Sequence, residues 1–121
     1  MSLAADAVVL IVALLHLAFL VLEMFLWDKP FGRRVFGHTR EAAAAGKVLA
    51  ANQGLYNGFL AAGLFWGLAQ GTQGAGGRAT VLFFLGCVIV AGVYGAATAS
   101  RRILFVQALP AAVALLLVLL A

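Results

Sequence analysis

Residues 7–27 read AVVLIVALLHLAFLVLEMFLW, and this stretch decides the fold class. Its only polar side chains are His16 and Glu23. A run of about 20 apolar residues is long enough to cross a hydrocarbon core about 30 Å thick as an α-helix. A secretory signal would start with positive charge and end at small residues, and neither feature is present, so we expect this segment to stay in the protein as its first membrane helix.

Three further apolar stretches follow. We expect helices over about residues 3–27, 40–70, 78–100 and 103–120, the first limited by Pro30 and the last kinked at Pro110. Hydrophobic residues make up 65% of the 121 positions and charged residues 10%, whereas a soluble domain carries about 25% charged residues. The sequence therefore predicts an all-α integral membrane protein, a four-transmembrane-helix bundle forming one domain over residues 1–121.

The basic residues predict the orientation. Seven of the eight Lys and Arg side chains lie in the first and third connections between the expected helices, and one, Arg78, lies in the second. The positive-inside rule places the first and third connections in the cytoplasm and both termini outside it. The net charge of +4 is spread between apolar segments, where it faces lipid headgroups, so nucleic-acid binding is not expected. The first connection, with Phe31, Val35 and Phe36, is expected to form an interfacial hairpin.

Polar side chains within the expected spans are the candidate functional groups, because an ionisable residue inside a bilayer is expensive. Glu23 lies near the cytoplasmic end of the first helix and His16 near mid-depth, seven residues away on the same stripe. Apart from His16, these polar groups concentrate in the cytoplasmic half, which predicts a pocket open to the cytoplasm or inner leaflet. The expected ligand-binding residues are Glu23, Asn52, Gln53, Tyr56, Asn57, Tyr94, Thr98 and Gln107.

Structural roles are the alternatives for the same residues. The amides of the second helix would also serve as interhelical hydrogen bonds, and Glu23 would also reach the headgroups or pair with Arg101 or Arg102. Two stripes of small residues predict close helix packing: Gly54, Gly58 and Ala62 in the second helix, and Ala91 and Gly95 in the third.

Three functions compete for this site. The first is binding of a lipid-like or amphipathic small molecule in the polar pocket. The second is a cofactor-free membrane isomerase that uses Glu23 as acid/base, with His16 or Tyr94 as candidate partner. The third is a proton-coupled exporter, which the strong charge bias and the one-sided polar cluster disfavour. No metal and no cofactor is expected, membrane lipid is the expected partner, and homo-oligomer formation is left open.

Three strings carry a resemblance to a known family: Glu23-Met24-Phe25-Leu26-Trp27, Arg34-Val35-Phe36-Gly37, and above all residues 52–58, NQGLYNG. In these the sequence resembles the short bacterial membrane proteins grouped as domain of unknown function 1304, from end to end. The resemblance implies a four-helix protein of the bacterial inner (plasma) membrane. It implies no activity, so function has to be argued from the site.

Overall fold

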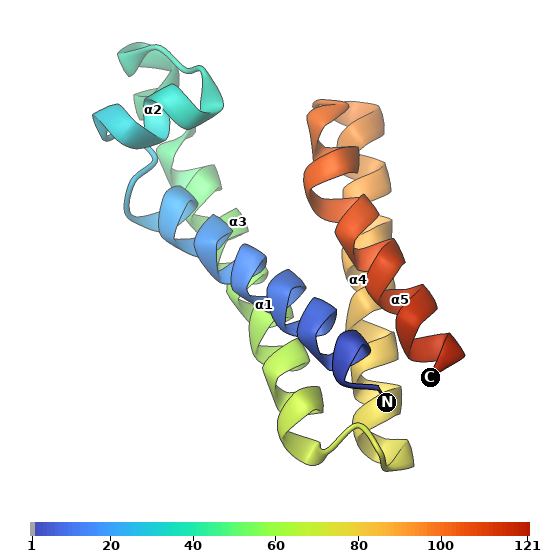
Figure 1. Cartoon of the computed structure of the whole chain (residues 1–121). Helices are drawn as coiled ribbons and strands as arrows, with labels where there is room; N and C mark the ends of the chain where they lie inside the picture. Colours follow the sequence, from blue (N-terminus) through green and yellow to red (C-terminus); the bar gives the residue numbers. More distant parts are fainter. Residues whose placement is uncertain (1) are drawn as a thin grey trace. The chain divides into compact units, whose positions relative to one another are not determined.

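The computed structural model describes residues 2–121, and in this part the fold is all-α, as predicted (Figure 1). Helix α1 spans Leu3–Met24, α2 spans Pro30–Phe36 and α3 spans Arg40–Gln70. Helix α4 spans Ala75–Thr98, and a π-helical segment, η1 (Leu104–Ala108), leads into α5 (Leu109–Leu120). The second expected helix, 40–70, has the bounds of α3, and the first connection contains a helix that the sequence did not predict.

Two of these helices, α1 with 22 residues and α4 with 24, are long and apolar enough to cross a membrane. Their mean hydropathy values are 2.6 and 2.2. Residues Leu104–Leu120 form a shorter apolar helix. Within the described chain, α3 is the longest helix, at 31 residues, but glycines and amides dilute its apolar character. Length and composition thus identify two candidate spans.

The end of α1 differs from the expected bound because the chain turns before Trp27 to begin α2. The amides of Phe25 and Leu26 both donate to the Val21 carbonyl, which ends the helical ladder at Met24. Pro30 then occupies the first turn of α2, where its missing N–H is no loss. At the other end, Gly37 adopts a left-handed conformation (φ 70°) that caps α2.

The described chain forms two compact units. Leu15–Phe59, here called the α2 unit, contains the second half of α1, all of α2 and the first part of α3. The residues up to Leu14 and Leu60–Ala121 form the α4–α5 unit. Helices α1 and α3 therefore each contribute to both units, and a single domain over 1–121 stays a prediction.

Four helices share the core of the α4–α5 unit. Fully buried side chains come from α1 (Val9), α3 (Leu64), α4 (Leu85) and α5 (Val118). The Thr72 hydroxyl donates to Asp6 at 2.7 Å, which ties the start of α1 to the turn after α3. Side chains from four helices thus pack into one core within this unit.

The third expected helix starts earlier than predicted. Gly71, with φ 90°, makes the turn after α3, and Gly74 is extended and precedes the first residue of α4, so the helix begins at Ala75 rather than Arg78. Gly95, predicted for close packing, does approach its neighbour, since an added Cβ would lie 3.1 Å from Ile103 Cγ2, and Gly92 does so more tightly, with an added Cβ 2.8 Å from the Ala108 Cβ. Ala91, expected in that role, is exposed.

The last helix is irregular ahead of Pro110. The Leu109 amide donates to the Leu104 carbonyl, five residues back, which defines the π-helical segment. Proline cannot donate to the carbonyl four residues before it and its ring crowds that position. A wider helical turn just before Pro110 keeps some of the backbone carbonyls hydrogen-bonded. The irregularity expected at Pro110 therefore takes the form of a π-helical turn.

Candidate functional site

Glu23 on α1 and Asn57 on α3 form a hydrogen bond between two helices of the α2 unit. The Asn57 amide Nδ2 donates to Glu23 Oε1 at 2.6 Å, and both residues are half-buried. In the described chain this is the one side-chain bond that joins a carboxyl group of α1 to an amide of α3. The expected meeting of Glu23 with the α3 amides therefore occurs at Asn57.

Glycines bring the two helices close at this point. A Cβ added at Gly54 would lie 2.7 Å from Met24 Cγ and 3.1 Å from Glu23 Cβ, and one at Gly58 would lie 2.5 Å from Leu20 Cδ1. The α3 backbone therefore packs directly against α1 on either side of the carboxyl group. Ala62, predicted as the third member of this stripe, is exposed, and Ala61 is buried instead.

The glycine face explains which amides meet α1. At 100° per residue, Asn57 lies about 60° from Gly54 around α3, whereas Asn52 and Tyr56 lie about 160° from it. Asn52 is exposed and its amide donates to the Val48 carbonyl of the same helix at 2.9 Å. Tyr56 is 62% exposed. Gln53 is exposed as well, so these three side chains lie away from the Glu23 contact.

His16 is fully buried and lies about two turns before Glu23 on α1. Its ring meets the Phe19 ring edge-on, with 5.2 Å between the centroids. A histidine packed in this way among apolar side chains has the surroundings of a structural residue.

The remaining predicted site residues belong to the α4–α5 unit. The Tyr94 ring is 71% exposed, and the Thr98 hydroxyl donates to the Tyr94 carbonyl at 2.7 Å, so it is satisfied within its own helix. Gln107 is half-buried within the π-helical segment. Among residues 2–121, the side chains of these three residues form no hydrogen bond with one another.

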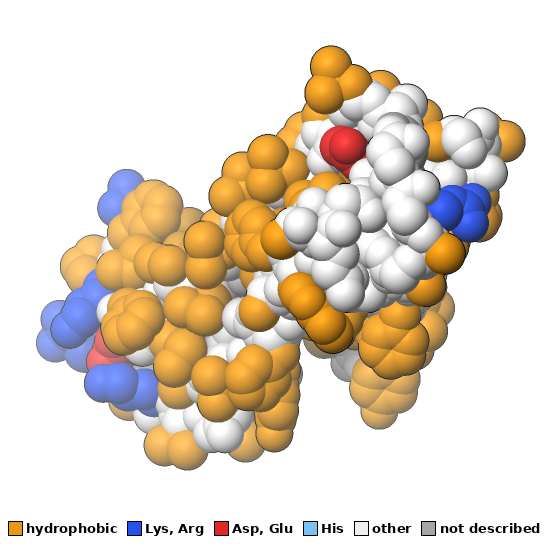
Figure 2. Space-filling model, turned by 90° about the horizontal axis from the view of Figure 1, so that it is seen from below, with side chains coloured by type: hydrophobic (Ala, Val, Ile, Leu, Met, Phe, Trp, Pro, Cys, Tyr) orange, Lys and Arg blue, Asp and Glu red, His pale blue; other side chains and the backbone are white. Residues whose placement is uncertain are grey.

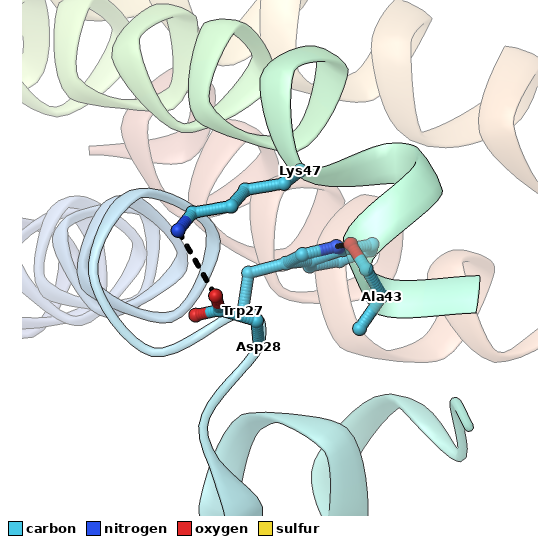
Figure 3. Close-up of polar contacts among 4 residues, drawn as sticks. All are labelled: Trp27, Asp28, Ala43 and Lys47. Atoms are coloured by element: carbon cyan, nitrogen blue, oxygen red, sulfur yellow. Dashed lines mark hydrogen bonds and ion pairs between the residues drawn. The ribbon is translucent and has the colours of Figure 1, made fainter. Parts of the chain in front are cut away.

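A second polar cluster, which the sequence did not predict, holds the end of α1 against the start of α3 (Figure 3). The Trp27 indole N–H donates to the Ala43 carbonyl at 2.9 Å, and Lys47 Nζ lies 2.9 Å from Asp28 Oδ2. The hydrogen bond from Lys47 lowers the pKa of Asp28 below its ordinary value of 3.8. Partners 16 and 19 residues apart have no local spacing signal, so only the folded chain shows them.

The rings of Trp27, Phe36 and His38 pack together next to this polar cluster. The Trp27 ring lies 4.8 Å from the Phe36 ring and 4.7 Å from the His38 ring, measured between centroids. The His38 amide donates to the Arg33 carbonyl, which closes the turn at the end of α2. The ring cluster and the turn hold α2 in one position within its unit.

Helix α4 carries an open groove on its surface. The groove has a volume of about 640 Å³ and an apolar lining, with Phe83 at one end and Tyr94 at the other. Gly86, Cys87, Val90 and Ala91 line the groove between them. Residues 2–121 contain no group of three or more His, Cys, Asp or Glu side chains that could hold a metal ion.

Comparison with known proteins gives one match. A family model described as "Protein of unknown function (DUF1304)" matches residues 10–119, nearly the whole chain. No curated protein and no solved structure matches the chain.

Proposed function

The chain belongs to the DUF1304 family, and from that premise we propose that it is a small multi-pass membrane protein that binds the polar end of an amphipathic or lipid-like molecule at Glu23 and Asn57. In this proposal α1, α3, α4 and the helix over residues 104–120 are four spans in a bacterial inner membrane, with both termini outside the cytoplasm. The two candidate spans and the basic first connection support this arrangement.

The observation that carries the binding proposal is the 2.6 Å bond between Glu23 and Asn57. A carboxyl group within a span is expensive unless it is paired, and here a neutral amide is its partner. One oxygen of the carboxyl group, Oε1, accepts from Asn57, while Oε2 has no protein partner among the described residues. That oxygen is available to a donor on a bound molecule, such as a hydroxyl, amine or headgroup.

Apolar side chains of α1 lie beside this polar point. Met24 Cγ lies 2.7 Å from the position of an added Cβ at Gly54, and Leu20 Cδ1 lies 2.5 Å from that at Gly58. A binding site for an amphipathic molecule needs mostly apolar contact area and a few placed polar groups. The proposal therefore seats the polar end at Glu23 and the apolar part along Leu20 and Met24 of α1.

The experiment compares Glu23→Gln with Glu23→Leu in the full chain. Glutamine keeps the shape and offers an oxygen to Asn57, so it should preserve thermal stability while reducing co-purifying amphipathic molecules, measured by native mass spectrometry. Leucine should reduce both, because it leaves the Asn57 amide unpaired. Retention of the same bound molecules by Glu23→Gln as by the unchanged protein would refute the binding role and leave the bond as a packing contact worth about 0.6 kcal/mol.

The two other functions predicted from the sequence use the same carboxyl group and stay predictions. A cofactor-free isomerase would convert a membrane-soluble substrate to an isomer of equal mass, which chromatography of extracted lipids would detect. A proton-coupled exporter would move a dye across proteoliposomes only under a pH gradient. A molecule that is retained without conversion or transport would favour binding.

A further inference from the structure

We propose that the α2 unit carries a docking surface for anionic phospholipid headgroups, formed by α2 and the residues just before it. The surface, here called the α2 surface, has an apolar part and a cationic part. Its apolar part is Phe25, Phe31 and Val35, and its cationic part is Lys29, Arg33 and Arg34. It is separate from the contact between Glu23 and Asn57.

Residues 28–47 carry an excess of positive charge. This segment carries five Lys and Arg side chains against two carboxylates, Asp28 and Glu41, which leaves three positive charges in excess. Asp28 is already paired with Lys47 at 2.9 Å. The cationic part of the α2 surface has no carboxylate within 4 Å in the described chain. The unbalanced charge complements an anionic partner.

Two side-chain nitrogen atoms in and just after α2 are shielded from solvent. Nε of Arg33 and Nδ1 of His38 are buried and have no hydrogen-bond partner among residues 2–121. A buried polar atom without a partner is expensive, and more so when it belongs to a charged group. The buried Nε is out of reach of an external anion, so an anion would complement the charge of Arg33 through the terminal nitrogens of the guanidinium, which form hydrogen bonds with phosphate oxygens.

Large apolar side chains are exposed close in sequence to these cations. Phe25 is 62% exposed, Phe31 54% and Val35 38%, although α2 has only seven residues. Figure 2 shows Lys and Arg side chains gathered among hydrophobic ones in one part of the molecular face. A helix with exposed aromatic and aliphatic groups beside cations fits the boundary between headgroups and acyl chains.

Contacts with the neighbouring segments hold the α2 surface in place. An added Cβ at Gly32 would overlap the Leu26 carbonyl oxygen, so the α2 backbone packs directly on the end of α1. Trp27 is bonded to Ala43 and packed on Phe36 and His38. The side chains and backbone of α2 therefore need little further ordering when a lipid binds. A partner that matches both the positive charge and the exposed apolar side chains of this surface is an anionic phospholipid.

The test is native mass spectrometry of the full chain in detergent, titrated with an equimolar mixture of phosphatidylglycerol and phosphatidylcholine. The unchanged protein should retain phosphatidylglycerol in preference. Arg33→Gln with Arg34→Gln should reduce that preference by about fivefold per removed charge, the factor that corresponds to about 1 kcal/mol near a membrane surface. The matched control, Arg101→Gln with Arg102→Gln, removes the same charge from a different connection and should keep the preference.

Two further variants separate the parts of the proposal. Phe31→Ser should weaken the binding of both lipids and leave the ratio in which they are retained unchanged, because it removes apolar contact only. Val48→Ser, at an exposed apolar position of α3 outside the α2 surface, should leave both the retention of the two lipids and their ratio unchanged. Equal retention of the two lipids by the unchanged protein, or an equal loss of preference in both arginine pairs, would overturn the assignment.

Discussion

Gly54→Ala should destabilise the contact between α1 and α3, whereas Gly86→Ala in the middle of α4 should not destabilise its helix. The two changes add the same methyl group to the interior of a long helix. An added Cβ at Gly54 would lie 2.7 Å from Met24 Cγ and 3.2 Å from the Leu20 carbonyl oxygen. At Gly86 nothing lies within 4 Å of the added atom. The comparison therefore isolates the close approach of the helices.

The magnitude follows from two opposing terms. Replacing glycine by alanine in a helix interior gains about 1 kcal/mol from backbone propensity, and this gain is common to both variants. Overpacking a tight contact costs about 1–3 kcal/mol, and this cost applies to Gly54 alone, because a backbone oxygen and the Glu23 Cβ cannot rotate away. The free energies of unfolding of the two variants should thus differ by about 1–3 kcal/mol.

The assay is unfolding of the full chain in mixed micelles, followed by circular dichroism at increasing denaturing-detergent content. Gly58→Ala provides an intermediate case, since the nearest atom to its added Cβ is Leu20 Cδ1, the end of a flexible side chain. The expected order of stability is Gly86→Ala, then Gly58→Ala, then Gly54→Ala. Equal stability of the Gly54 and Gly86 variants would refute the packing of α3 on α1 at this point.

Three other perturbations test separate features. Gly37→Ala should cost about 1–2 kcal/mol in unfolding free energy, because φ is 70° with no atom within 4 Å of an added Cβ, and Gly37→Asn should cost less. The depressed pKa of Asp28 means that its pairing with Lys47 stabilises the fold above the ordinary pKa of 3.8 and is lost as pH falls through the lower folded value; Asp28→Asn should abolish this acid-dependent part of the melting temperature, and an unchanged acid profile would contradict it. In a cysteine-free background, Arg33→Cys should resist an impermeant thiol reagent in intact cells and Gly74→Cys should react; labelling at Arg33 alone would reverse the proposed orientation.

The long helices could be predicted from the sequence because their ends carry local signals. Thr39 precedes the first residue of α3 and caps it, because its hydroxyl accepts a hydrogen bond from the Ala42 amide at 3.1 Å. Gly71 supplies the positive φ that ends the same helix. Helix α2 was missed although Pro30 and Gly37 mark its two ends, because a seven-residue helix has too few apolar repeats to separate it from an irregular hairpin.

The candidate site could be predicted only in part. The depth of Glu23 and of the α3 amides indicated that they would meet, and Asn57 does meet it. Choosing among the amides required the packing face of α3, which Gly54 and Gly58 define. Had the amides been placed relative to those glycines, Asn52 would have been assigned to the opposite face.

The π-helical segment over Leu104–Ala108 changes which alterations of chain length this helix can absorb. A π-helical turn holds one residue more than the α-helical turn it replaces, so losing one residue inside it leaves the phase of everything downstream intact. The same deletion a few positions later would rotate the following residues by about 100°. Ala114 and Val118, which are fully buried, would then turn out of the core. Length variation among homologous chains should accordingly be tolerated at Leu104–Ala108 and excluded from the residues that follow Pro110.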